Sequence, residues 1–154
     1  MNDLFGFSLR HITSFLRMQL PACVKAHPRP AVIGVNHAAG EGWDGVRNYQ
    51  ASNNMKTMEI GDLVFFYHSV NEKQIVGIAE VSALYHPDPT DASGRFGMVN
   101  IRAVKPMAAP VTLAQIKSDV RLADMALVRQ SRLSVTPVSA EQWAIIMEMG
   151  KTSL

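Results

Sequence analysis

Two apolar segments separated by a short polar turn constrain the fold of this chain more than any other feature. Residues 63–68 and 74–84 are rich in β-branched and aromatic side chains, which favour strands. The polar residues 71–73 between them are typical of a turn, and a second tight turn is predicted at 59–62. The pair therefore predicts a β-hairpin, around which the rest of the chain must be arranged.

Shorter patterns predict two more strands. Apolar side chains alternate well enough over residues 96–104 to indicate a third strand, after a proline-containing loop at 85–94. The prolines within 106–110 are expected to break the chain again. A final strand is predicted over 128–135. One further short strand, over 31–35, is predicted before the hairpin.

Helices are predicted where a capping side chain precedes an apolar pattern. Ser139 with Gln142 three residues later is a capping-box sequence, and Gly150 ends that helix. A short apolar turn is expected over 122–127. The predicted helices are 46–58 after Asp44, 112–118 with Thr112 as the cap, and the one from Ser139 to Met149.

The chain of 154 residues predicts one domain. Residues 1–20 are interpreted as a poorly defined N-terminal extension with an amphipathic helical pattern, and residues 21–154 as a single α+β domain. No apolar run reaches the roughly 18 residues that cross a bilayer, so no membrane partner is expected. A single Cys23 suits a reducing compartment, and we expect a cytoplasmic protein. The net charge of +2 requires any nucleic-acid affinity to come from a local basic patch.

Three stretches combine aromatic, amide, hydroxyl and cationic side chains: residues 43–49, 65–69 and 131–135. They contain no evident nucleophile beside its base, and the histidines show no metal-ligand spacing. Neither a metal nor a cofactor is therefore expected, and an enzyme is disfavoured. Stacking surface, hydrogen-bond donors and positive charge suit the recognition of a planar polar ligand.

The first stretch supplies three of the candidate binding residues: Trp43, Arg47 and Asn48. Trp43 is predicted to stack on a base, the alternative being a plug in the core. Arg47 and Asn48 follow Gly45 at a predicted helix start, where donors face an anion or a base edge. The alternative is that these two side chains brace a loop. Asn53, on the same predicted helix, is included in the candidate site.

The other two stretches supply hydroxyl, imidazole and guanidinium groups. Tyr67, His68 and Ser69 end a predicted strand, where side chains can face a cleft. The alternative for His68 is a half-buried ring held by hydrogen bonds. Arg132 with Ser134 is predicted either to hold a phosphate or to close the barrel through backbone hydrogen bonds.

These motifs, in this order, resemble the EVE domain family of the PUA-like superfamily. The resemblance covers about residues 43–150. The matching runs are WDGVRNYQA at 43–51, GD at 61–62 leading into FYHS at 66–69, IVGI at 75–78, YHPDPT at 85–90, LAQIK at 113–117 and SRLSVTPVS at 131–139.

The chain departs from the family before Trp43. Family members share a first strand that reads roughly Trp-Leu-x-Lys-Ser-Glu-Pro, whereas residues 23–28 keep only the lysine and the proline. The spacing to Trp43 is preserved, which suggests an altered reading frame or a decayed first strand. Ser52 stands where relatives often carry arginine, which removes a contact to a nucleic-acid backbone.

The resemblance implies a PUA-like pseudo-barrel of mostly antiparallel strands with short flanking helices. It also implies a non-enzymatic module that reads a modified or flipped base of DNA or RNA. In that hypothesis Trp43 stacks on the base, Asn48, His68 and Ser69 read its edge, and Arg47 and Arg132 hold the backbone or seal the pocket. The alternatives are a small-molecule or nucleotide sensor, a protein-interaction module on the same barrel, and a pocket left incomplete by the divergent N-terminal segment.

Overall fold

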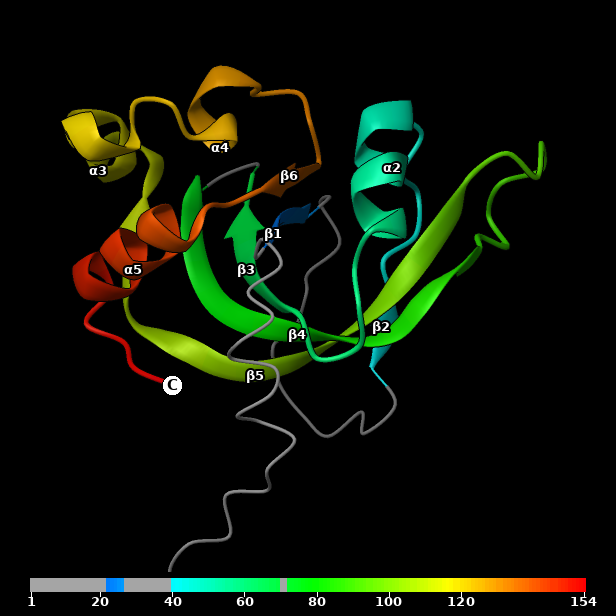
Figure 1. The fold of residues 1–154 in the computed structure, drawn as a ribbon, viewed down its shortest axis with the longest axis horizontal. Helices are drawn as coiled ribbons and strands as arrows, with labels where there is room; N and C mark the ends of the chain where they lie inside the picture. The colour runs from blue at the N-terminus through cyan, green and yellow to red at the C-terminus, as the bar shows by residue number, and fades with distance from the viewer. Residues whose placement is uncertain (1–21, 27–39, 70–71) are drawn as a thin grey trace, which may run out of the picture.

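The computed structural model describes residues 22–26, 40–69 and 72–154 as one curved sheet with helices around it (Figure 1). The sheet has six strands in the order β2-β5-β4-β3-β1-β6. Only β1 and β3 run parallel; all other neighbours are antiparallel. The strands are β1 (Ala22–Ala26), β2 (Glu41–Gly42), β3 (Leu63–His68), β4 (Gln74–Pro87), β5 (Gly97–Thr112) and β6 (Val135–Pro137).

The predicted hairpin is confirmed as β3 and β4, with all of β3 pairing antiparallel to Gln74–Glu80 of β4. β3 has the predicted bounds, while β4 continues three residues past the predicted end, to Pro87. β1 also forms and pairs with β3 on one side and with β6 on the other. The segment with divergent residues therefore still supplies a strand to the sheet.

The predicted break at residues 106–110 is wrong, because β5 runs through it to Thr112. Past Arg102, β5 has only β4 as a strand partner, so prolines without an N–H are tolerated at this edge. The register shifts there: Gly77 is opposite Pro106, but Ile75 is opposite Val111. Five residue steps on β5 thus match two on β4, which places Pro106 at the start of a bulge and Pro110 within it.

The alternation predicted for the start of β5 is confirmed. Val99 and Ile101 are buried, while Met98 and Asn100 between them are half-buried. The predicted final strand over 128–135 is wrong, since residues 126–129 form a helical turn and β6 begins only at Val135. A pattern of eight residues is too short to separate a helical turn from a strand by periodicity alone.

Two helices begin with the predicted caps. Thr112 and Gln115 form a capping box before α3, and Ser139 and Gln142 form another before α5. Figure 1 shows α3, α4 and α5 grouped together, whereas α2 lies apart from them beside the β4–β5 hairpin. The helices are α2 (Tyr49–Lys56), α3 (Leu113–Ser118), the 3₁₀ turn η1 (Val120–Leu122), α4 (Ala126–Arg129) and α5 (Ala140–Met149).

The helix predicted over 46–58 is shorter and has a different cap. α2 begins at Tyr49, and the Asn48 side chain accepts the N–H of Ala51 at 3.0 Å in place of the predicted cap Asp44. Gly45, with φ of +79°, separates Asp44 from the helix. The helix predicted over 1–20 and the strand predicted over 31–35 lie outside the described residues.

Two clusters of buried side chains hold the sheet and helices together, and β3 contributes to both. Val64 and Phe66 enter the cluster under α2, whereas Phe65 and Tyr67 enter the cluster under α5. This follows from the two-residue repeat of a strand, whose successive side chains point to opposite faces. None of the described helices has the length and apolar character needed to span a bilayer.

Candidate nucleic-acid interface

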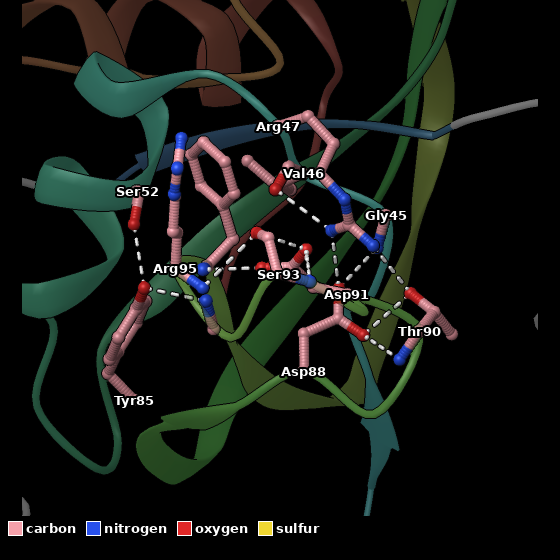
Figure 2. A network of polar contacts seen from close by, with 12 residues as sticks. Gly45, Val46, Arg47, Ser52, Tyr85, Asp88, Thr90, Asp91, Ser93 and Arg95 are labelled. Carbon is pink, nitrogen blue, oxygen red and sulfur yellow. Dashed lines mark hydrogen bonds and ion pairs between the residues drawn. The ribbon is translucent and has the colours of Figure 1, made fainter.

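The turn that joins β4 to β5 is attached to the segment before α2 by one buried carboxylate. Asp88, which is 4% exposed, accepts hydrogen bonds from the backbone N–H of Gly45 at 2.9 Å and from Arg47 at 2.7 Å. Thr90 donates its backbone N–H at 2.7 Å and its hydroxyl at 2.6 Å to the other oxygen. Figure 2 shows these donors converging on Asp88. One side chain thus fixes the hairpin tip to the start of α2.

The charge of Asp88 is stabilised by these contacts. Burial raises the pKa of a carboxyl, but the hydrogen bonds from Thr90, Arg47 and Gly45 outweigh burial and hold the pKa of Asp88 well below its ordinary value. Hydrogen bonds from Ser93 and Phe96 lower the pKa of Asp91 in the same turn to about 2. Both carboxylates therefore stay ionised at neutral pH and organise the turn.

Arg47 is committed to this attachment. Its guanidinium donates to Asp88 and, at 2.9 Å, to the hydroxyl of Thr90, and it also reaches the Val46 carbonyl at 3.1 Å. Asn48 is the N-cap of α2. Arg47 and Asn48 therefore make the loop-bracing contacts that the sequence analysis gave as the alternative to ligand binding. Both side chains nevertheless lie at the surface.

A second link joins α2 to the hairpin. The hydroxyl of Ser52, 2% exposed, lies 2.7 Å from the hydroxyl of Tyr85. Tyr85 in turn accepts the backbone N–H of Gly97 at 2.6 Å (Figure 2). The small Ser52 is thus a packing residue here. Tyr85 is a structural residue that the sequence did not single out.

Three aromatic rings form a row with a buried ring in the middle and partly exposed rings at both ends. Trp43 meets Phe66 edge-on, with ring centroids 5.7 Å apart and planes at 87°. Phe66 meets His68 edge-on at 5.8 Å and 77°. Phe66 is buried, Trp43 is half-buried, and the His68 side chain is 31% exposed. The predicted residues Trp43 and His68 are thereby connected through Phe66, which the sequence analysis did not list as a site residue.

Trp43 has one unusual polar atom. Its indole Nε1 is buried and has no hydrogen-bond partner, one of two such side-chain atoms in the described part of the chain. A buried donor without a partner costs about 1–3 kcal/mol. His68, by contrast, is paired, with Nδ1 2.7 Å from the Glu72 carboxylate. The row thus contains a ring with an unused donor and a ring held in a fixed orientation.

The remaining predicted residues are dispersed. Tyr67 is 3% exposed in the cluster under α5, on the face of β3 opposite Phe66 and His68. Ser69 follows the end of β3 and is half-buried. Asn53 on α2 and Arg132 in the turn before β6 are exposed, and Ser134 is half-buried. The structure therefore brings Trp43 and His68 together around Phe66 but separates Tyr67 from them.

Comparisons with known proteins identify relatives of the whole described domain. The model of the EVE domain family matches residues 24–149. Human thymocyte nuclear protein 1 is 30% identical over 130 residues, and the mouse protein of that name 34% over 134. The human match covers 70% of this chain but 58% of the human protein, so the chain spans a little over half the length of such relatives.

Solved structures show the same fold. A protein from Agrobacterium tumefaciens is 43% identical with a TM-score of 0.81, covering 86% of this chain and 94% of that one. The human THYN1 protein in complex with DNA containing 5-methylcytosine is 25% identical with a TM-score of 0.74, covering 88% of this chain and all of that one. The predicted PUA-like, mostly antiparallel fold is confirmed by this likeness.

Proposed function

The chain belongs to the EVE domain family, and on that premise we propose that it is a nucleic-acid-binding module that accepts a modified base in an aromatic pocket beside Trp43. The base enters flipped from a duplex or unpaired from a single strand. The observation that carries the proposal is the aromatic row, which joins Trp43 through Phe66 to His68 at the surface. A base stacked on an aromatic side chain gains about 1–3 kcal/mol.

The polar atoms of the row supply recognition. The unpartnered Nε1 of Trp43 is a donor that an acceptor on the ligand would satisfy, which would recover the cost of burying it alone. His68, oriented by Glu72, presents the rest of its ring near the surface. We assign edge reading to His68 and Ser69. Asn48 has only its amide N–H groups to offer, because its oxygen caps α2.

The choice of ligand class is supported by a relative. The human THYN1 protein has been crystallised with DNA that contains 5-methylcytosine. Methylated cytosine is therefore the first ligand to test on this chain. Extracting a base from a duplex costs a few kcal/mol, which one stacking contact barely offsets, so a modified or single-stranded base is the easier target.

We assign binding rather than catalysis to the site. The ring nitrogen of His68 is paired with a carboxylate, not with a nucleophile. Ser69 is adjacent in sequence, which is poor geometry for a hydroxyl and its base. The competing hypothesis of a nucleotide sensor predicts that a free modified nucleoside binds as tightly as an oligonucleotide; much weaker nucleoside binding argues against the sensor.

The test is a tryptophan-fluorescence titration with matched single- and double-stranded oligonucleotides carrying cytosine, methylcytosine, hydroxymethylcytosine or methyladenine. Quenching by one modified strand is expected, and Trp43→Ala removes it. Trp143→Phe is the matched control, because Trp143 lies away from Trp43 in the cluster under α5. There its ring stacks on that of Phe65, with the ring centroids 3.8 Å apart. Equal quenching by modified and unmodified strands from the folded protein contradicts the proposal.

The proposal also places the protein in the cytoplasm, because a chain with a single cysteine suits a reducing compartment. The curated vertebrate relatives are called nuclear proteins. Fractionation of cells that express the tagged full chain distinguishes a cytoplasmic from a nuclear location. Recovery of the protein in a fraction other than the cytoplasmic one contradicts the cytoplasmic assignment.

A further inference from the structure

We propose that a second surface, between α2 and the tip of the β4–β5 hairpin, binds the phosphodiester backbone of a nucleic-acid strand. The inference rests on the proposed function and extends it, since a pocket for one base does not explain how the strand is held. We call this region the α2–hairpin surface. It consists of Tyr49, Lys56, Tyr85, Arg95 and Phe96. Figure 1 shows the hairpin rising beside α2.

The surface is hollowed next to the hairpin tip. The hollow has a volume of about 180 Å³ and is lined chiefly by Lys56, Tyr85, His86, Arg95 and Phe96. A cationic side chain therefore comes from each side, one from the last turn of α2 and one from the hairpin. Two other lining residues, Tyr85 and Phe96, are aromatic. None of these residues belongs to the row formed by Trp43, Phe66 and His68.

The cations of the hollow are available to an anion. Four of the six arginines in the described part of the chain pair with carboxylates, and Arg95 is not among them. Lys56 likewise has no carboxylate partner among the described residues; its ammonium nitrogen lies 5.3 Å from the ring centroid of Tyr85. Such cations hold phosphate without first giving up an ion pair.

The acidic groups of the hairpin tip do not compete strongly for these cations. Asp88 is saturated by Gly45, Arg47 and Thr90. Asp91 accepts the backbone N–H and the hydroxyl of Ser93 and the N–H of Phe96. Both carboxylates keep their charge, but their oxygens accept hydrogen bonds within the turn, and among the described residues neither pairs with Lys56 or Arg95.

Aromatic side chains beside the cations complete the surface. Tyr49 is 63% exposed, and its ring lies 4.9 Å from that of Phe96 with planes at 41°. The guanidinium carbon of Arg47 lies 6.0 Å from the Phe96 centroid. Exposed aromatic rings interleaved with cations are what proteins use to hold single strands, by stacking bases while the cations follow the backbone.

Hydrogen bonds and close packing connect the walls of the hollow to one another. The Tyr85 hydroxyl joins Ser52 of α2 to Gly97 of β5. Gly97 has no room for a side chain, since a Cβ there would lie 2.4 Å from the His86 carbonyl oxygen and 2.6 Å from the Tyr85 ring. A site whose walls are already fixed loses less entropy on binding. The long side chains of Lys56 and Arg95 thus project from backbone segments whose positions are already fixed.

The test compares a double variant with a charge-matched control in the full chain. Lys56→Gln with Arg95→Gln removes the two cations of the hollow. Lys117→Gln with Lys151→Gln removes two exposed cations near α3 and α5, away from α2 (Figure 1). Fluorescence anisotropy gives Kd for a methylated duplex, the unmodified duplex and an RNA strand of the same sequence, over a series of salt concentrations.

We expect the hollow variant to bind both duplexes more weakly by the same factor. The slope of log K against log salt should become shallower by about 1.8 for the duplexes, because each lost phosphate contact contributes about 0.9. The control double variant should keep the wild-type slope. A hollow variant with an unchanged slope, or one that merely equals the control, overturns the proposal. The hollow variant should also bind the RNA strand more weakly than the control does, because the phosphates are common to DNA and RNA.

The failure of this inference is distinct from the failure of the proposed function. The change in the salt slope between the hollow variant and the control reports on the α2–hairpin surface, whereas the ratio of the methylated to the unmodified Kd reports on the Trp43 pocket. If wild type binds the methylated and the unmodified duplex with the same Kd but the hollow variant has a shallower salt slope, the modified-base pocket is contradicted and the backbone site is supported. If wild type and the hollow variant both prefer the methylated duplex and the hollow variant keeps the wild-type salt slope, the modified-base pocket is supported and the backbone site is contradicted.

Discussion

Arg47 and Asp88 are 41 residues apart in the sequence and are joined by a hydrogen bond of 2.7 Å from the guanidinium to the carboxylate. This contact links the two most distinctive motifs of the chain, residues 43–51 and 85–90. Asp88 accepts the N–H of Gly45, two residues after Trp43, and the Arg47 guanidinium lies 6.0 Å from the ring centroid of Phe96 in the α2–hairpin surface. We conclude that the pair positions both candidate binding regions without being required to touch a ligand.

Asp88→Asn should lower the free energy of unfolding by about 2 kcal/mol at pH 7, the typical worth of hydrogen bonds to a buried charged group. The amide keeps the shape but offers one acceptor oxygen to Gly45, Arg47 and Thr90. Urea denaturation monitored by circular dichroism measures the change. The control is Asp124→Asn at an exposed ion pair, expected to cost under about 0.5 kcal/mol. Equal costs contradict the buried attachment.

The difference between wild type and Asp88→Asn should shrink in acid. The pKa of Asp88 in the folded state lies below the roughly 3.9 of an unfolded aspartate. Its contribution is therefore fully present above about pH 5 and is lost as the pH falls below about 4 towards the folded pKa. Denaturation curves at steps from pH 7 to pH 3 test this sign. A gap that stays constant or widens in acid would falsify it.

Gly97→Ala should destabilise the fold by about 3 kcal/mol, because the added methyl meets backbone at 2.4 Å and an aromatic ring at 2.6 Å. Gly94→Ala in the same hairpin meets no atom within 4 Å and should cost about 1 kcal/mol through its positive φ alone. Thermal unfolding of both variants compares the two causes. A smaller loss for Gly97→Ala than for Gly94→Ala shows that the hairpin adjusts.

Ser139→Ala should cost about 1 kcal/mol, because the hydroxyl of Ser139 accepts the N–H of Gln142 at the start of α5. Ser153→Ala, near the exposed C-terminus, is the control and should change stability by less than about 0.5 kcal/mol. Chemical denaturation gives both values. No difference between the variants means that α5 is held by packing alone.

The elements that could be predicted are those with local causes. β3 has its predicted bounds because its aromatic and β-branched residues favour a strand. α3 and α5 begin at capping boxes whose residues lie three positions apart in the sequence. The path of β5 through Pro106 could not be predicted, since it depends on an edge and a bulge that exist only once β4 has paired. The second half of the short Ala126–Arg129 helix was assigned to a strand over 128–135, because so short a segment shows no clear periodicity.

The candidate site was predictable in its residue types but not in its partners. Trp43 and His68 were predicted as site residues, while Phe66 between them was noted in the stretch 65–69 but not included in the candidate site. Arg47 was expected to face a ligand, and its pairing with Asp88 depends on a contact between distant motifs. Arg95 and Lys56 have no carboxylate partner among the described residues, which likewise becomes visible only when the partners of the other cations are known.

The central claim is that one base leaves its stack and enters the pocket beside Trp43. It is tested most directly with a duplex that carries 5-methylcytosine next to 2-aminopurine, a base whose fluorescence rises when a neighbour is unstacked. At saturating protein we predict a rise with wild type and Trp143→Phe, a smaller one on the unmodified duplex, and none with folded Trp43→Ala. A flat signal with saturated wild type, or an equal rise with Trp43→Ala, contradicts the account.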